Sequence, residues 1–87
     1  MRAVITVIGK DMVGILAKVC TICAANGANV VEVTQSVLQE FFAMIMIVEL
    51  SGSSVTELSD QLSSMGEEMG LRIHVMHEDI FNSMHKI

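Results

Sequence analysis

Residues 29–50 read NVVEVTQSVLQEFFAMIMIVEL, two strand-like runs separated only by Gln39 and Glu40. The first run, residues 29–38, alternates valine with polar residues, which is typical of a strand with one buried face. The second run, residues 41–50, is apolar on both faces, which favours a strand that is covered on both sides. The two runs therefore predict a β-hairpin with a tight turn at Gln39 and Glu40.

The segment before this hairpin predicts a strand followed by a helix. Residues 2–8 (RAVITVI) form a short β-branched run, which favours a strand, and residues 9–11 (GKD) are typical of a turn. Residues 12–26 carry apolar side chains at helical spacing, and the carboxylate of Asp11 is suited to cap the first amides of this helix. Gly27 follows at the place where helices commonly end in a left-handed residue.

The segment after the hairpin repeats this order. Residues 55–69 have apolar side chains at steps of three and four, with Ser54 before them as a capping-box residue and Gly70 after them, so we expect a helix. Residues 71–77 predict the last strand. Residues 79–87 predict a tail whose apolar side chains share one helical face and pack on the sheet or on a neighbouring subunit. These apolar side chains are Ile80, Phe81, Met84 and Ile87.

The predicted order is strand, helix, strand, strand, helix, strand. Two such halves meeting at a hairpin form the ferredoxin-like βαββαβ plan, an α+β fold with a four-stranded antiparallel sheet and both helices on one face. The chain has no proline, so we expect one domain over residues 1–87 with a short C-terminal tail. Residues 29–38 form an edge strand in this plan, and the second apolar side of residues 41–50 lies on the open face. Both features favour a homodimer or a larger oligomer.

The composition excludes two classes of partner. Ten acidic and five basic residues give a net charge of −5, and the bases are scattered, so we expect no binding to nucleic acid. The longest apolar run, residues 41–48, has eight residues, whereas a membrane-spanning helix needs roughly 20, so we expect no membrane partner. Hydrophobic residues make up 52% of the chain, an excess that a subunit interface would bury.

Cys20 and Cys23 form a C-x-x-C pattern. Redox motifs of this kind lie at a helix N-terminus, which lowers the thiol pKa. This pair lies about two turns into the predicted helix, on its apolar stripe. We interpret both residues as core residues with free thiols. Together with the absence of a recognisable secretory signal, they favour a cytoplasmic protein.

His74, His77 and His85, with Glu78 and Asp79, offer nitrogen and oxygen atoms of the kind that bind metals. His74 and His77 are three residues apart on a predicted strand, so their side chains point to opposite faces of the sheet. We therefore expect no metal site.

The sequence predicts no pairing of a nucleophile with a base and no pair of carboxylates in a cleft. The acidic side chains of the second helix fit a solvated face, as expected for an amphipathic helix. We expect a protein that is not an enzyme, with no catalytic residues and no cofactor.

Two short motifs resemble the signature of the ACT domain. Residues 9–17 follow the pattern G-x-D-x-x-G-I-L-A, and residues 25–30 read ANGANV. The hairpin, with Gln35 and the pair Phe41 and Phe42, resembles the ACT-like N-terminal part of formyltetrahydrofolate deformylases and of the glycine-cleavage repressors. Over nearly its full length, the chain is most similar to free-standing single-ACT proteins of unassigned function.

The resemblance implies a dimer that holds an amino acid or a similar small molecule at the subunit interface. In members that bind amino acids, the loop after the first strand and the start of the second strand line the site. The matching residues are Gly9, Asp11, Gly14 and Asn29. The chain departs from many members at residues 12–13 (MV), where they carry a basic residue and proline.

Three of these positions have two interpretations each. Gly14 would let an anion approach the free amides of the first helical turn, or it would only let the helix pack closely. Asp11 would bind a ligand ammonium group or cap the helix, and Asn29 would bind an amino-acid head group or form a turn. Gln35, in mid-strand, favours a structural hydrogen bond between subunits. For a ligand site, we expect Gly14 and Asn29 to flank one corner of the fold.

Two functions agree with these observations. The first is a ligand-sensing regulatory homodimer, in which binding at the interface shifts the subunits and a partner enzyme, which the sequence does not identify, responds. The alternative is a protein–protein interaction module that has no metabolite ligand and pairs through its sheet or its tail.

Overall fold

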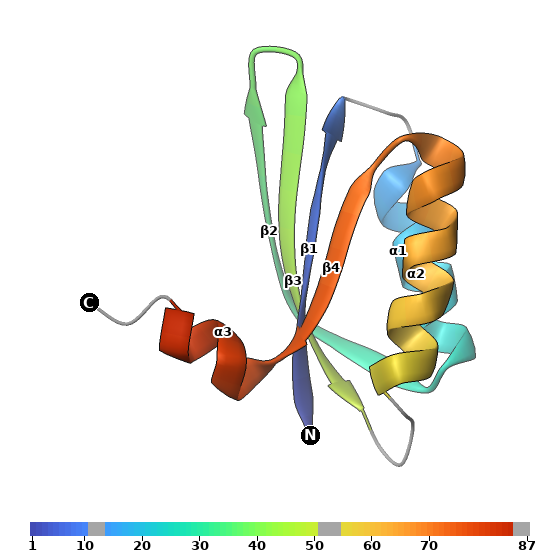
Figure 1. Ribbon diagram of the computed structural model, residues 1–87, viewed down its shortest axis with the longest axis vertical. Helices are drawn as coiled ribbons and strands as arrows, with labels where there is room; N and C mark the ends of the chain where they lie inside the picture. Colours follow the sequence, from blue (N-terminus) through green and yellow to red (C-terminus); the bar gives the residue numbers. More distant parts are fainter. Residues whose placement is uncertain (11–13, 51–54, 85–87) are drawn as a thin grey trace.

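A computed structural model describes residues 1–10, 14–50 and 55–84 (Figure 1). The chain forms four strands and three helices over these residues. In chain order they are β1 (Arg2–Lys10), α1 (Ile15–Ala25), β2 (Ala28–Leu38), β3 (Phe41–Leu50), α2 (Val55–Met69), β4 (Arg72–His77) and α3 (Glu78–Met84).

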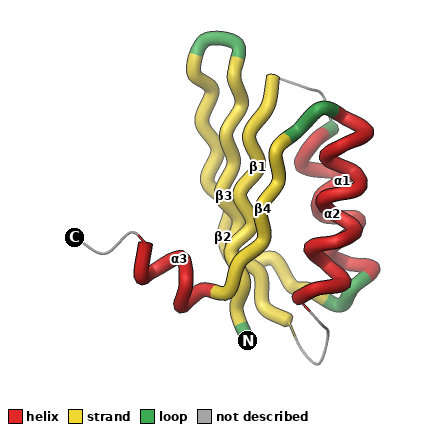
Figure 2. The backbone as a smooth tube through the Cα atoms, in the orientation of Figure 1, coloured by secondary structure: helices red, strands yellow, loops and turns green. Residues whose placement is uncertain are grey.

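The four strands form one antiparallel sheet in the order β2-β3-β1-β4. Helices α1 and α2 lie side by side on one face of this sheet, and α3 lies on the other side (Figure 2). This is the ferredoxin-like βαββαβ fold with a short C-terminal helix, as the order of predicted elements indicated. None of the described helices is long and apolar enough to cross a bilayer.

The hydrophobic core lies between the sheet and the pair α1 and α2. Alternate residues of β1 and β3 point into it, and the helices close it with residues at helical spacing. Its fully buried members include Ile5, Met44, Met46, Ile15, Val19, Leu58 and Leu62. Gly66 of α2 is also buried, and a Cβ atom there would lie 3.1 Å from the carbonyl oxygen of Leu71. This glycine therefore lets α2 pack tightly against the start of β4.

The predicted turn and helix start after the first strand are both wrong. Gly9 and Lys10 continue β1, because they pair with Phe42 and Phe41 of the long strand β3. Helix α1 begins at Ile15, and its N-cap is Gly14 with a left-handed φ of 86° rather than the predicted Asp11. An αL residue cannot continue a right-handed helix, so the helix cannot run back through Gly14. Asp11 itself lies outside the described residues.

The central hairpin agrees with its prediction, with one irregularity in β2. The turn lies at Gln39, which takes a positive φ of 56°. The register shifts between Val30 and Glu32, so the alternation of β2 changes phase around Val31. Val33 and Val37 then lie on the side of the helices and are 36% and 60% exposed. Strand β2 is an edge strand whose apolar side chains are incompletely covered within one chain.

The predicted tail forms helix α3, which begins one residue earlier than expected. It contacts β1 and β4. Phe81 is half-buried, whereas Ile80 and Met84 are exposed. Ile87 and the predicted metal candidate His85 lie outside the described residues. The tail therefore packs on its own sheet through part of its apolar face.

We expect truncation after Asp79 to lower the melting temperature. Removing Phe81 uncovers apolar surface of β1 and β4, at a cost of about 1 kcal/mol, which corresponds to roughly 4–8 °C for a domain of this size. Differential scanning calorimetry measures the shift. The ion pair of Arg2 with Glu78 is kept in this truncation, and breaking it alone by Arg2→Gln should cost less than about 1 kcal/mol. An unchanged melting temperature after truncation would show that α3 adds nothing to stability.

Candidate ligand-binding site

Gly14 occupies the corner between β1 and α1. It is exposed, and among the described residues no heavy atom beyond Gly14 and its chain neighbours lies within 4 Å of the place that a Cβ atom would take. Its carbonyl oxygen accepts a hydrogen bond of 3.0 Å from the amide of Lys18. Gly14 supplies no side-chain cap, and the first turn of α1 contains no acidic residue. The N-terminal end of α1 is thus approachable at Gly14, and its amides and dipole favour an anion.

Gly9 lies one strand position before the end of β1, on the side of the helices. A Cβ atom at Gly9 would collide with the Cδ2 atom of Leu71. The close approach of Leu71 therefore explains this glycine without any ligand. A ligand-binding role for Gly9 stays a prediction.

Asn29 lies at the opposite end of the sheet from Gly9. Asn29 is exposed and pairs with Glu49 of β3, whereas Gly9 pairs with Phe42 of the same strand. Phe42 and Glu49 are seven positions apart, which corresponds to about 23 Å along the strand. The expectation that Asn29 and Gly14 flank one corner is therefore wrong for a single chain. Whether either residue binds a ligand stays a prediction.

Gln35 is exposed on β2 and pairs with Met44 of β3. Its place on an edge strand leaves the amide accessible to another subunit.

A second amide, Asn26 at the end of α1, has a role within the chain instead. Its Nδ2 atom donates to the carbonyl oxygen of Ile22 and to Oε1 of Gln61, each at 2.9 Å. These bonds join α1 to α2, so Asn26 serves the fold.

The C-x-x-C pair lies in the helix layer. Cys23 is fully buried and Cys20 is half-buried, and both thiols are free. Burial, with a smaller contribution from the neighbouring Cys20, raises the pKa of the Cys23 thiol to about 11. A redox cysteine needs a lowered pKa, so the structure confirms the interpretation of Cys23 as a core residue.

We expect only one thiol to react quickly with a disulfide reagent in the native protein. At pH 8 the Cys23 thiol is almost wholly protonated and shielded, because its pKa is about 11, whereas Cys20 is partly accessible. Mass spectrometry after brief labelling should find the label on Cys20, with Cys23 labelled only in denaturant. Equal labelling of both residues in the native state would contradict the buried position of Cys23.

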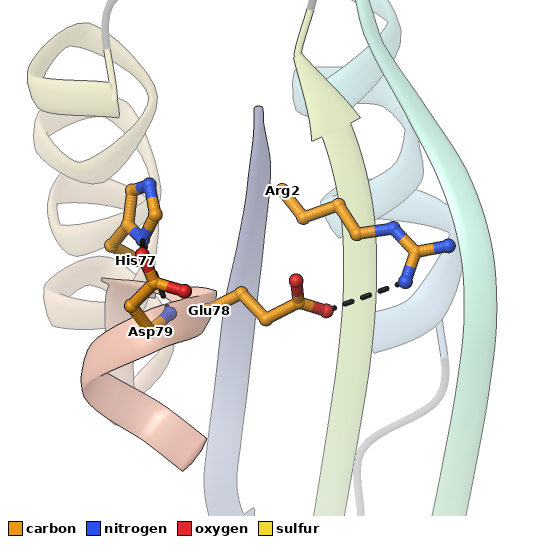
Figure 3. Close-up of polar contacts among 4 residues, drawn as sticks. All are labelled: Arg2, His77, Glu78 and Asp79. Atoms are coloured by element: carbon orange, nitrogen blue, oxygen red, sulfur yellow. Dashed lines mark hydrogen bonds and ion pairs between the residues drawn. The ribbon is translucent and has the colours of Figure 1, made fainter. Parts of the chain in front are cut away.

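Polar contacts join α3 to β1 and β4 (Figure 3). Nη1 of Arg2 lies 3.3 Å from Oε2 of Glu78. The amide of Asp79 donates to Nδ1 of His77 over 3.1 Å, which satisfies one of the free amides at the start of α3. His77 pairs with Ala3 and His74 with Thr6, so the two histidines lie on opposite faces of β4, as predicted.

A further feature, which sequence reasoning missed, is a hollow of about 340 Å³ on the open face of the sheet. Strands β1, β3 and β4 form its floor, and α3 forms one wall. The hollow depends on the angle at which α3 leaves β4. No residue pattern predicts that angle.

A four-stranded antiparallel sheet in the order β2-β3-β1-β4, with two helices on one face, defines a ferredoxin-like domain. The ACT-domain family matches residues 2–76. The chain therefore belongs to the ACT-domain family, as its two motifs predicted. Residues 77–87 lie beyond the matched part, so a single ACT domain over residues 1–87 stays a proposal.

Similar proteins agree with this assignment. The UPF0237 protein YjhC of Lactococcus lactis subsp. lactis is 44% identical over 87 residues, which cover 100% of both chains. An ACT domain protein from Streptococcus pneumoniae superposes with a TM-score of 0.82 at 34% identity, covering 93% of each chain. The ligand-free regulatory subunit of aspartate kinase from Thermus thermophilus gives a TM-score of 0.68 at 28% identity, covering 85% of this chain and 49% of the other.

Proposed function

We propose that this protein is a regulatory, non-catalytic homodimer of the cytoplasm that binds an amino acid and passes the signal to a partner enzyme. ACT domains are in general regulatory domains that bind small molecules such as amino acids. The similar chain from Thermus thermophilus is itself a regulatory subunit. The observation that carries the proposal is the uncovered edge strand β2, which leaves room for a second subunit beside an exposed helix N-terminus.

The dimer forms by antiparallel pairing of the two β2 strands. Val33 is the middle residue of β2, so pairing about Val33 puts the partner's Asn29 opposite Val37. Val37 pairs with Phe42, and Phe42 pairs with Gly9. The partner's Asn29 then lies in the same row of the sheet as Gly9, at the end where α1 begins. The separation along the strands is thereby removed, and three strand spacings, or about 14 Å across the sheet, remain between them.

The ligand lies between the two subunits in this arrangement. The amides at Gly14 bind its carboxylate, because a helix N-terminus favours an anion. The partner's Asn29 is the second residue of its β2 strand and pairs with Glu49 on the open face, so its side chain turns around the strand end to bind the head group through its amide, which offers both a donor and an acceptor. Asp11 binds the ammonium group of an amino acid. A ligand held by both subunits binds one placement of the subunits more tightly than others and so shifts their population.

A second function has its own support. Val33 and Val37 expose apolar surface on β2 without any ligand, and an edge strand of this kind pairs with strands of other proteins. The protein is then an interaction module that pairs with another chain and binds no metabolite.

A thermal-shift screen against the proteinogenic amino acids distinguishes the two functions. A ligand that binds only the folded dimer raises the melting temperature in proportion to the logarithm of its concentration. We expect one or a few amino acids to do so. If none shifts the melting temperature at millimolar concentration, the amino-acid site is wrong and the interaction module is the better account.

A further inference from the structure

Helix α3 and the open face of the sheet enclose the hollow of about 340 Å³. In Figure 1, α3 leaves the lower end of β4 and projects away from the sheet, on the side opposite α1 and α2. The residues that line the hollow are almost all apolar. They include Ile8, Ala43, Ile45, Met76, Phe81 and Met84. A volume of this size is at the lower end of the range for small-molecule sites, which are mostly apolar with a few polar groups.

The fold buries only part of this apolar face. Val4 lies on this face at the end covered by α3 and is 1% exposed. Ile8, four residues further along β1, is 50% exposed, and Met84 of α3 is 66% exposed. Covering these side chains would gain hydrophobic free energy. The floor from the level of Met76 to that of Ile8 spans four residues, or about 13 Å along the strands.

Two polar side chains lie next to each other in this apolar floor. Thr6 of β1 and His74 of β4 are paired in the register, and both line the hollow. Among the described residues, neither side chain has a hydrogen-bond partner. A hydroxyl group and an imidazole can both donate to one acceptor on a ligand.

The charges of the open face are unequally placed. Arg72 pairs with Ile8 just beyond the upper end of the hollow, at the edge of β4, where it also lines a separate depression with Ser63 and Glu67 of α2. Lys10 follows Ile8 by two residues on the open face. Within the described part of the chain, neither cation has a salt-bridge partner. At the lower end, by contrast, Glu78 is already paired with Arg2 at 3.3 Å. The upper end therefore attracts an anion, and the region under α3 accepts an apolar group.

We propose that this hollow binds a monocarboxylic acid with an apolar body, such as a medium-chain fatty acid. The carboxylate lies beside Arg72 and accepts hydrogen bonds from Thr6 and His74. The apolar chain runs over Ala43 and Ile45 toward Phe81. This site lies on the sheet face opposite α1 and does not involve β2 pairing, so it does not rest on the proposed amino-acid site.

Decanoate, below its micellar concentration, is the probe, with decanol as its uncharged counterpart. We expect saturable binding of decanoate by calorimetry and weaker binding of decanol. In protein labelled at the methionine methyl groups, the NMR signals of Met76 and Met84 should move on titration. Those of Met65 and Met69, which pack against the core from α2, should stay in place.

Three variants locate the site. Ala43→Phe fills the floor and should abolish decanoate binding. Met84→Gln replaces an apolar side chain in the wall of the hollow with a polar one. Because Met84 is exposed, this variant should fold and bind decanoate more weakly even if the Ala43 variant fails to fold. Arg72→Gln should weaken decanoate binding about threefold to tenfold and leave decanol unchanged. Lys18→Gln, which removes the same charge from α1 on the opposite face, is the matched control and should bind decanoate as the parent does.

Several results would overturn the proposal. They are the absence of saturable decanoate binding, equal movement of all four methionine signals, and equal affinity for decanol. A change from dimer to monomer in Ala43→Phe, measured by sedimentation, would instead assign the open face to a second copy of the chain. The amino-acid screen of the parent protein is unaffected by any of these outcomes, so the two proposals fail separately.

Discussion

Replacing Val33 and Val37 together by lysine is expected to convert the proposed dimer into monomers. Both side chains are incompletely covered on the edge strand β2, at 36% and 60% exposure. In the proposed dimer, both side chains lie next to the β2 strand of the partner subunit. Two lysines from each subunit would therefore bring four positive charges together there. Charged residues on an edge strand are a common means of preventing such pairing. We expect the dimer dissociation constant to rise at least about a hundredfold.

Sedimentation equilibrium at micromolar concentration measures this change. The lysines can extend to solvent in the monomer, because Val33 and Val37 are not part of the buried core, so the circular dichroism spectrum should be unchanged. The matched control is Ser63→Lys with Ser64→Lys, two exposed positions on α2 that add the same charge away from the interface. A parent protein that is monomeric, or a lysine variant that stays dimeric, would contradict pairing through β2.

The sequence predicted the hairpin and the element order well because these depend on local patterns. Residues 41–50 form β3 with the predicted bounds, since a run of ten residues that are all apolar except Glu49 has no helical periodicity and follows the turn at Gln39. Gly70 ends α2 as expected and takes a positive φ of 71°. Such signals act over a few residues, so they survive in the tertiary structure.

The errors arise where pairing with a distant segment decides the local structure. Gly9 is a turn signal by itself, but its pairing with Phe42 and the close approach of Leu71 make it a strand residue. Gly14 was expected inside a helix that begins at residue 12, whereas its left-handed backbone makes it the N-cap of a helix that begins at Ile15. The register shift near Val31 likewise comes from the pairing of β2 with β3, and no pattern within β2 indicates it.

The candidate site was harder to predict than the fold for a related reason. The motif residues Gly14 and Asn29 are fifteen positions apart in the chain, and a motif does not say which end of the sheet each residue reaches. Strand direction decides this, because β2 begins at the end of the sheet where β1 begins. Two residues that a single chain separates can still belong to one site if a two-fold axis brings a second copy beside the first.

Gly14→Leu is expected to block the approach to the amides of α1 and to weaken amino-acid binding at least tenfold, or by about 1.4 kcal/mol. A β-carbon at a left-handed residue also costs about 1–2 kcal/mol of stability. Gly70→Leu is the matched control, because Gly70 has a φ of 71° and open space around it as Gly14 does. It should destabilise the protein similarly and bind the ligand as the parent does.

Asn29→Ala is expected to weaken binding of the same amino acid by about 1–2 kcal/mol, through the loss of one or two hydrogen bonds. The two variants together distinguish a shared site from two separate ones. After unfolding and refolding of an equal mixture, half of the dimers contain one Gly14→Leu and one Asn29→Ala subunit. In each mixed dimer, one site combines the intact Gly14 of one subunit with the intact Asn29 of the other, so about a quarter of all sites should bind with parental affinity. Calorimetry counts these sites directly. If the mixture binds no better than either variant alone, Gly14 and Asn29 do not form one site across the dimer, and the proposed arrangement of β2 strands must be abandoned even if the parent protein binds an amino acid.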